Sequence, residues 1–195
     1  MLLNSRKMEV IYKIATFLLL SCFITGCANN PTIIKGYDEV KKQQICKLAP
    51  HLIVNEFGWF GRIRQTTISL NKASNGDIIG TFSVHTTGKK YASLSSKSNI
   101  SFKITSQDGS VGVMKFKGFD HEYKFVQREI YTQFGSRMLP GSDSSISIRL
   151  TAEQLRKLTS DTKVDLSITT EKDPISTTLN VNDKHNLQEF LVQCI

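Results

Sequence analysis

Four cysteines, at positions 22, 27, 46 and 194, carry most of the reactive chemistry in this sequence of 195 residues. Thiols can pair as disulfides, bind zinc, act as nucleophiles or be alkylated by lipid. Cys22 lies inside an apolar run and Cys27 lies just beyond its end, whereas Cys46 and Cys194 lie near opposite ends of the remaining chain. The even number of cysteines therefore does not imply two disulfides, and each pair needs its own explanation.

The histidines and acidic residues give little support for a metal site or an active site. The sequence contains no His-Glu-x-x-His zinc motif, no Gly-x-Ser-x-Gly elbow and no glycine-rich nucleotide loop. The tightest ionisable cluster is Asp120-His121-Glu122. On a strand, Asp120 and Glu122 would share one face and His121 would point to the other, which suits cation binding better than a histidine–carboxylate site. An ordinary polar loop also fits this cluster, so we predict no cofactor, no metal and no enzyme.

The first 26 residues have the pattern of a secretory signal peptide. Residues 1–13 carry three basic residues and one acidic residue, and residues 14–24 contain no charge. A membrane-spanning helix needs about 20 apolar residues, so a run of this length fits the core of a signal peptide instead. Small residues follow the run at Thr25, Gly26 and Ala28.

The stretch Ile24-Thr25-Gly26-Cys27 resembles the lipobox of bacterial lipoproteins. The resemblance implies that Cys27 receives a diacylglyceryl group, that the leader is removed just before it, and that the new amino terminus is acylated. Such a protein is held at the membrane without spanning it. Ala28 stands where inner-membrane lipoproteins typically carry Asp, so the resemblance implies the outer membrane of a Gram-negative cell, with a Gram-positive surface as the alternative. It covers only about 28 residues and implies no fold, and it leaves open which face of the membrane is occupied.

Cys46 and Cys194 are then the unmodified thiols of the mature chain, in an oxidising envelope. Leu187, Phe190, Leu191 and Cys194 follow the i, i+3, i+4, i+7 spacing of one helical face, so Cys194 should point toward the core. We predict a Cys46–Cys194 disulfide, with two buried free thiols as the alternative.

The remaining sequence predicts one domain of the α+β class. We expect a signal peptide at 1–26, the lipidated cysteine and a tether at 27–37, and a single domain at 38–195, with about seven or eight mainly antiparallel strands and two or three helices. Asn75-Gly76 predicts a hairpin turn, and Thr151 with Gln154 predicts a capping box. Alternation predicts strands at 62–70, 77–84, 99–105, 111–119, 122–131, 146–150, 164–168 and 175–181. Residues 122–131 could instead form a short helix. Helices are expected at 38–48, at 151–158 and from Asp183 onward.

The stretch FGWFGR at 57–62 is a candidate binding loop. Its glycines allow sharp turns, and its aromatic rings are of the kind that proteins present to partners or lipid headgroups. We predict partner binding by Trp59, Phe60 and Arg62, although the rings could instead fold back over the core.

Lysines occupy the polar phase of two expected strands. Lys103, Lys115 and Lys117 could line one solvated sheet face and attract anionic envelope material, or they could merely keep the protein soluble and its strand edges unpaired. The net charge of +8 does not indicate nucleic acid, because the expected compartment holds none. We therefore expect a lipid-anchored, non-catalytic envelope protein that binds another envelope protein or an anionic envelope component. A small hydrolase of cell-wall or lipid material, using Asp120, His121 and Glu122, is the alternative.

Overall fold

The computed structural model describes residues 32–40, 42–58, 62–73, 75–88, 93–132, 135–160, 162–170 and 173–195. These residues form ten strands and two helices. The strands are β1 (Ile33–Asp38), β2 (Gln43–Gly58), β3 (Arg62–Lys72), β4 (Ile78–Thr87), β5 (Asn99–Thr105), β6 (Val111–Lys117), β7 (Phe119–Thr132), β8 (Gly135–Leu150), β9 (Lys163–Ile168) and β10 (Ile175–Thr178). The helices are α2 (Ala152–Thr159) and α3 (Val181–Cys194).

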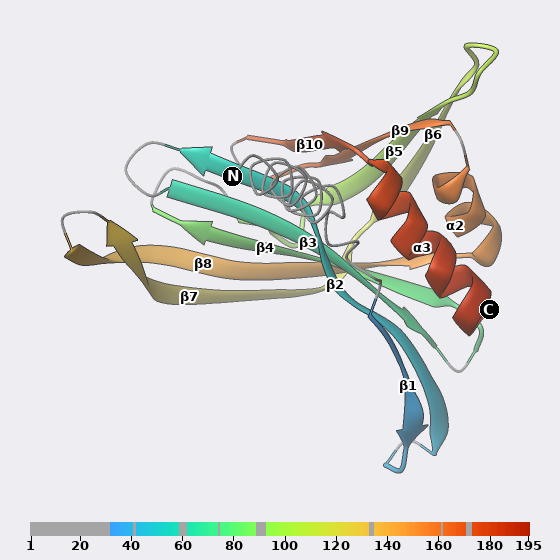
Figure 1. Ribbon diagram of the computed structural model, residues 1–195, viewed down its shortest axis with the longest axis horizontal. Helices are drawn as coiled ribbons and strands as arrows, with labels where there is room; N and C mark the ends of the chain where they lie inside the picture. The colour runs from blue at the N-terminus through green and yellow to red at the C-terminus, as the bar shows by residue number, and fades with distance from the viewer. Residues whose placement is uncertain are drawn as a thin grey trace, which may run out of the picture. The chain divides into compact units, whose positions relative to one another are not determined.

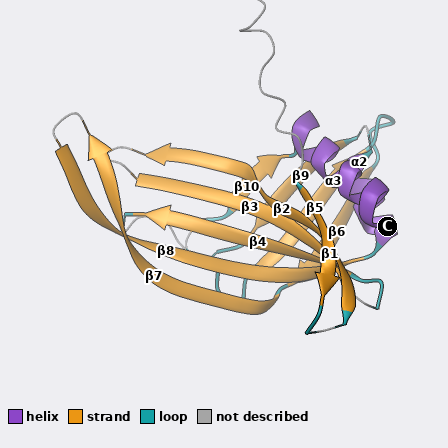
Figure 2. Ribbon diagram, turned by 60° about the horizontal axis from the view of Figure 1, so that its bottom comes forward, coloured by secondary structure: helices purple, strands orange, loops and turns teal. Residues whose placement is uncertain are grey.

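The strands form two antiparallel sheets, shown in Figure 1 and Figure 2. The larger sheet has the order β1-β2-β3-β4-β8-β7, and the smaller has the order β10-β9-β5-β6. The predicted α+β class is wrong, because the protein is mainly β. Ten strands replace the seven or eight expected, and the described residues contain two helices, which lie together at one end of the sheets.

A single core lies between the two sheets and under the helices. Buried and partly exposed residues alternate along β4 and β9, as they must when one face of each strand is covered. The rings of Phe82 on β4 and Phe102 on β5 lie 6.3 Å apart between centroids, which joins the larger sheet to the smaller one. The helices close one end with Leu155 and Leu158 from α2, and with several apolar residues of α3.

Two local predictions are confirmed in detail. Gly76 adopts a positive φ of 87° in the turn between β3 and β4, a conformation that glycine reaches without strain. Thr151 and Gln154 form the reciprocal hydrogen bonds of a capping box at the start of α2. The last helix begins at Val181 after an Asn180 cap, so the residue expected to open it, Asp183, lies in its first turn.

Gly118 lets the chain cross from the smaller sheet to the larger one. β6 ends at Lys117 and β7 begins at Phe119, so the whole crossing falls on this glycine. A Cβ atom built on Gly118 would collide with the side chain of Ile146 in the buried part of β8. The absence of a side chain therefore allows the two sheets to approach at this point.

The helix expected at 38–48 is wrong, because this segment forms a β-hairpin. β1 and β2 pair from Ile33 opposite Leu48 to Asp38 opposite Gln43. Asp38 accepts a hydrogen bond from the Val40 backbone in the turn. The acid-then-lysine pattern typical of a short helix is overridden by pairing of β2 with strands on both sides. β1 also lies partly within the segment expected to be a tether.

Helix α3 is attached to β2 at both of its ends. Near its start, the Asn186 amide nitrogen donates to His51 Nδ1 over 2.9 Å, and His51 Nε2 donates to Asp183 Oδ1 over 2.8 Å. Near its end, Cys194 is bonded to Cys46. Five residues of extended strand and eleven residues of helix both span about 16 Å, so the two attachments match in length.

Replacing His51 with alanine is expected to lower the free energy of unfolding by about 2–3 kcal/mol. The reason is that the Asp183 carboxylate is only 3% exposed, and it would lose its side-chain donor on β2. Guanidinium unfolding followed by circular dichroism measures the change. The exposed His185 on the same helix is the matched control, and His185→Ala should change stability by less than about 0.5 kcal/mol. Equal effects of both substitutions would contradict this assignment.

Candidate functional site

Several predicted site residues fall outside the described residues. These are the lipidation residue Cys27 and the loop residues Trp59 and Phe60. Arg62 is described only as the first residue of β3, where its backbone pairs with Gly58. Phe57, which precedes this connection, is 72% exposed. Partner binding by Trp59, Phe60 and Arg62 therefore stays a prediction.

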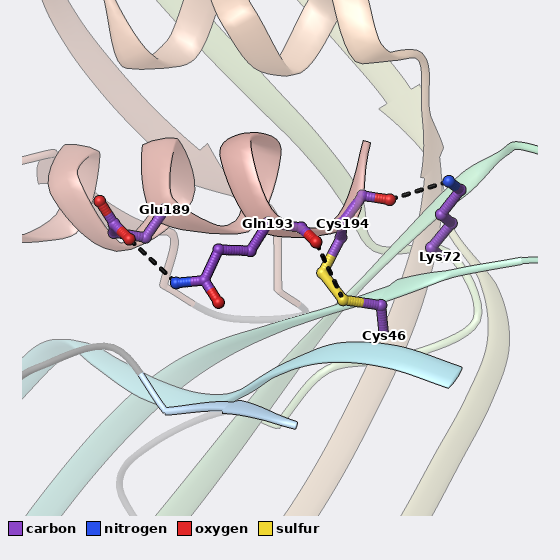
Figure 3. Close-up of a disulfide and its surroundings, with 5 residues drawn as sticks. All are labelled: Cys46, Lys72, Glu189, Gln193 and Cys194. Carbon is purple, nitrogen blue, oxygen red and sulfur yellow. Dashed lines mark hydrogen bonds between the residues drawn. A yellow bond between two sulfur atoms is a disulfide. The ribbon is translucent and has the colours of Figure 1, made fainter. Parts of the chain in front are cut away.

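The predicted Cys46–Cys194 disulfide is confirmed, and Figure 3 shows its surroundings. The two Cα atoms lie 5.6 Å apart, although 148 positions separate the residues in sequence. Lys72 at the end of β3 donates a hydrogen bond of 2.8 Å to the carbonyl oxygen of Cys194. The last turn of α3 is therefore held by a covalent bond to β2 and by a polar bond to β3.

Four lysines share the outer face of the smaller sheet, as the sequence predicts for three of them. Pairing places Lys117 opposite Asn99, Lys115 opposite Ser101, and Lys103 between Val113 and Asp165. The added member is Lys163, two residues from Asp165 on β9. We call Lys103, Lys115, Lys117 and Lys163 the lysine face. All four side chains are exposed.

One carboxylate lies within the lysine face. Asp165 accepts a hydrogen bond from Thr178 and forms an ion pair of 3.2 Å with Lys163. The Thr178 hydrogen bond, together with Lys163 and Lys103, keeps the pKa of Asp165 below its usual value despite slight burial. Asp165 therefore stays ionised at neutral pH, and the face carries four positive charges against one negative charge.

The lysine face also offers hydroxyls and apolar surface. A shallow hollow of about 530 Å³ crosses β10, β9, β5 and β6, and its lining includes Ser101, Ser167 and Ser176 beside Lys103. β6 pairs with β5 without a register shift, so it has no bulge, and Val111 and Val113 point outward, each about half exposed. Ammonium groups and hydroxyls both donate hydrogen bonds to phosphate or carboxylate oxygens. This arrangement can bind an extended anionic surface.

A second polar cluster lies on the outer face of the larger sheet. Asp143 on β8 accepts a hydrogen bond of 2.8 Å from His85 Nδ1 on β4. It also forms a salt bridge with Arg128 on β7. Partial burial raises the pKa of Asp143, but His85 and Arg128 together outweigh that effect and lower it. Lys124 and Glu122 line the same hollow, whose volume is about 490 Å³.

Besides the His51–Asp183 pair that attaches α3, the described residues contain two clusters of histidine and carboxylate, and neither has a nucleophile bonded to its histidine. No serine hydroxyl there bonds to His85, so the His85–Asp143 pair lacks the nucleophile that acyl transfer requires. His121 turns away from Glu122 and bonds the carbonyl oxygen of Leu94, as expected for neighbouring residues on a strand. Asp120 lies at an irregularity in β7 with a positive φ. No group of three potential metal ligands occurs among the described residues.

Comparison with known proteins does not assign this chain to a family. No protein-family model matches this chain, and no curated protein matches it. Within the described residues, no helix is long and apolar enough to cross a membrane.

Proposed function

We propose that this protein is a lipoprotein of the bacterial outer membrane, anchored through Cys27, whose β-domain binds an anionic envelope component without catalysis. The lipobox-like stretch supports the anchor. The disulfide between Cys46 and Cys194 supports an oxidising compartment, because such bonds are rare in reducing ones.

The observation that carries the binding proposal is the lysine face. Its four lysines extend over three adjacent strands of a regular sheet, and the hydroxyl residues lie between them. Each lysine near an anionic membrane surface contributes roughly 1 kcal/mol of attraction. A flat array of this kind suits the phosphate groups of lipids or lipopolysaccharide better than a single small ligand, which would need an enclosed pocket.

The anchor would keep the domain close to such a surface. Five residues separate Cys27 from the start of β1 at Ile33. A chain of this length spans at most about 20 Å. The tethered domain would therefore sample the membrane surface at high effective concentration, and weak electrostatic contacts would be enough to orient it.

Lysine acylation of the mature lipoprotein in vesicles tests this proposal. The protein is inserted into phosphatidylcholine vesicles with and without anionic phosphatidylglycerol, and the acylation rate of each lysine is read by mass spectrometry. We expect Lys103, Lys115 and Lys117 to react about fivefold more slowly on the anionic vesicles, because headgroups cover them. The protection should weaken at high salt.

Two controls make the result decisive. Lys157 on α2 is similarly exposed but lies outside the lysine face, so its rate should not change. Changing Lys103, Lys115 and Lys117 to glutamine should remove the protection of Lys163. Equal slowing of Lys157, or no slowing of the lysine face, would contradict the proposal.

A further inference from the structure

The edge strand β7 is long and has one open side. It has 14 residues, contains no proline, and is last in its sheet. Figure 1 and Figure 2 both show it along the margin of the larger sheet. Its strand neighbour among the described residues is β8, so backbone groups on the other side can bond another strand. The free edges of β1, β6 and β10 are shorter.

One face of β7 also exposes aromatic side chains. Tyr123 is 56% exposed, Phe125 is 61% exposed and Tyr131 is 79% exposed. Tyr123 and Phe125 pair with Ser144 and Ser142 on β8, so alternation places all three rings on one face of the strand. A run of exposed rings along an open edge is typical of an interaction site.

The charges of β7 are complementary to the same strand in a second copy. In an antiparallel pair related by a two-fold axis through residue 125, Glu122 of each copy lies opposite Arg128 of the other. The same register places Tyr123 opposite Gln127 and Phe125 opposite itself. Because the pair of strands is symmetric, the interface contains the Glu122–Arg128 charge pair twice. Arg128 already bonds Asp143, but its guanidinium has enough N–H groups to serve both carboxylates.

Neighbouring registers are less favourable. An axis through Lys124 places that residue opposite its own copy, and an axis through Val126 places Lys124 opposite Arg128. Like charges directly opposite one another destabilise a strand pair. Of these three registers, the axis at Phe125 is the one that pairs opposite charges and places no like charges opposite one another.

We infer that two copies of this chain pair through residues 122–128 of β7, with Phe125 on the two-fold axis, and join their larger sheets into one. The axis is perpendicular to the sheet, so both lysine faces lie on the same side of the dimer. Anchors in one membrane would hold the copies at high effective concentration, so an interface of this modest length is sufficient.

Cysteine crosslinking of the full mature lipoprotein in intact envelopes tests the inference. The native cysteines do not compete, because Cys46 is bonded to Cys194 and Cys27 carries lipid in the mature protein. Phe125→Cys should yield a disulfide-linked dimer on mild oxidation. The control Tyr131→Cys, which is more exposed on the same strand, should yield at least about tenfold less, because its two copies would lie far beyond disulfide reach.

Two further variants test the register. Tyr123→Cys and Gln127→Cys should each fail to crosslink alone, because each lies about 13 Å from its own copy. When the two variants are expressed together, they should crosslink to each other. Adding Glu122→Arg to Phe125→Cys should suppress the dimer. Absence of a dimer with Phe125→Cys, or equal crosslinking of Tyr131→Cys, would overturn the inference.

Discussion

Replacing Cys46 and Cys194 together with alanine is expected to lower the free energy of unfolding by about 3–5 kcal/mol. The bond closes a loop that spans almost the whole domain. In the chain-entropy model, a loop of this length restricts the unfolded state by about 5 kcal/mol. Without the bond, the His51 contacts, the Lys72 hydrogen bond and apolar packing in the core still hold α3, but no covalent link joins it to β2.

Guanidinium unfolding of the mature protein in mild detergent, followed by circular dichroism, measures this loss. Wild-type protein treated with reductant should match the double alanine variant, and oxidised wild-type should exceed both. A double variant within about 1 kcal/mol of the oxidised protein would show that the bond contributes little to the stability of this fold.

Changing Cys27 to serine is expected to abolish lipid attachment and leader removal together. The lipid would be carried by a thioether, which a serine hydroxyl does not form, and cleavage in lipoproteins follows lipidation. The protein should then keep its leader and fail to reach the proposed outer-membrane location, because a short apolar run does not anchor it there. Metabolic labelling with palmitate and density fractionation of membranes measure both effects.

Cys22 provides a matched control for this experiment. It lies five residues earlier, within the segment expected to be discarded. Cys22→Ser should therefore keep full palmitate labelling, normal size and outer-membrane fractionation. Labelling that survives in Cys27→Ser, or that disappears in Cys22→Ser, would contradict the anchor.

The core strands were predictable because each shows its covered face directly in the sequence. Apolar and polar residues largely alternate along β4 and β9 in the sequence. In the structure, buried and more exposed residues alternate along both strands in the same way. β1 and the first part of β2 lack that alternation, since the exposed hairpin depends on pairing rather than on burial of one face. That missing pattern explains why the sequence predicts a helix at 38–48 and fewer strands than the structure has.

The candidate sites also differ in how far the sequence alone predicts them. Lys103, Lys115 and Lys117 of the lysine face could be predicted, because the phase of each lysine on its own strand assigns its face, whereas the place of Lys163 follows from the pairing of β9 with β5. The Asp143 cluster could not, because His85, Asp143 and Arg128 come from three strands whose register brings them together. Likewise, no local signal links His51 with Asp183, which lies 132 positions away.

The intact mass of the mature protein, purified from envelopes, tests the central claim most directly. We expect a polypeptide that begins at Cys27 and carries a diacylglyceryl group, an amino-terminal acyl chain and one internal disulfide. A mature chain that begins at another residue, or that carries no fatty acid, would contradict the lipid anchor and the membrane-facing role proposed for the lysine face.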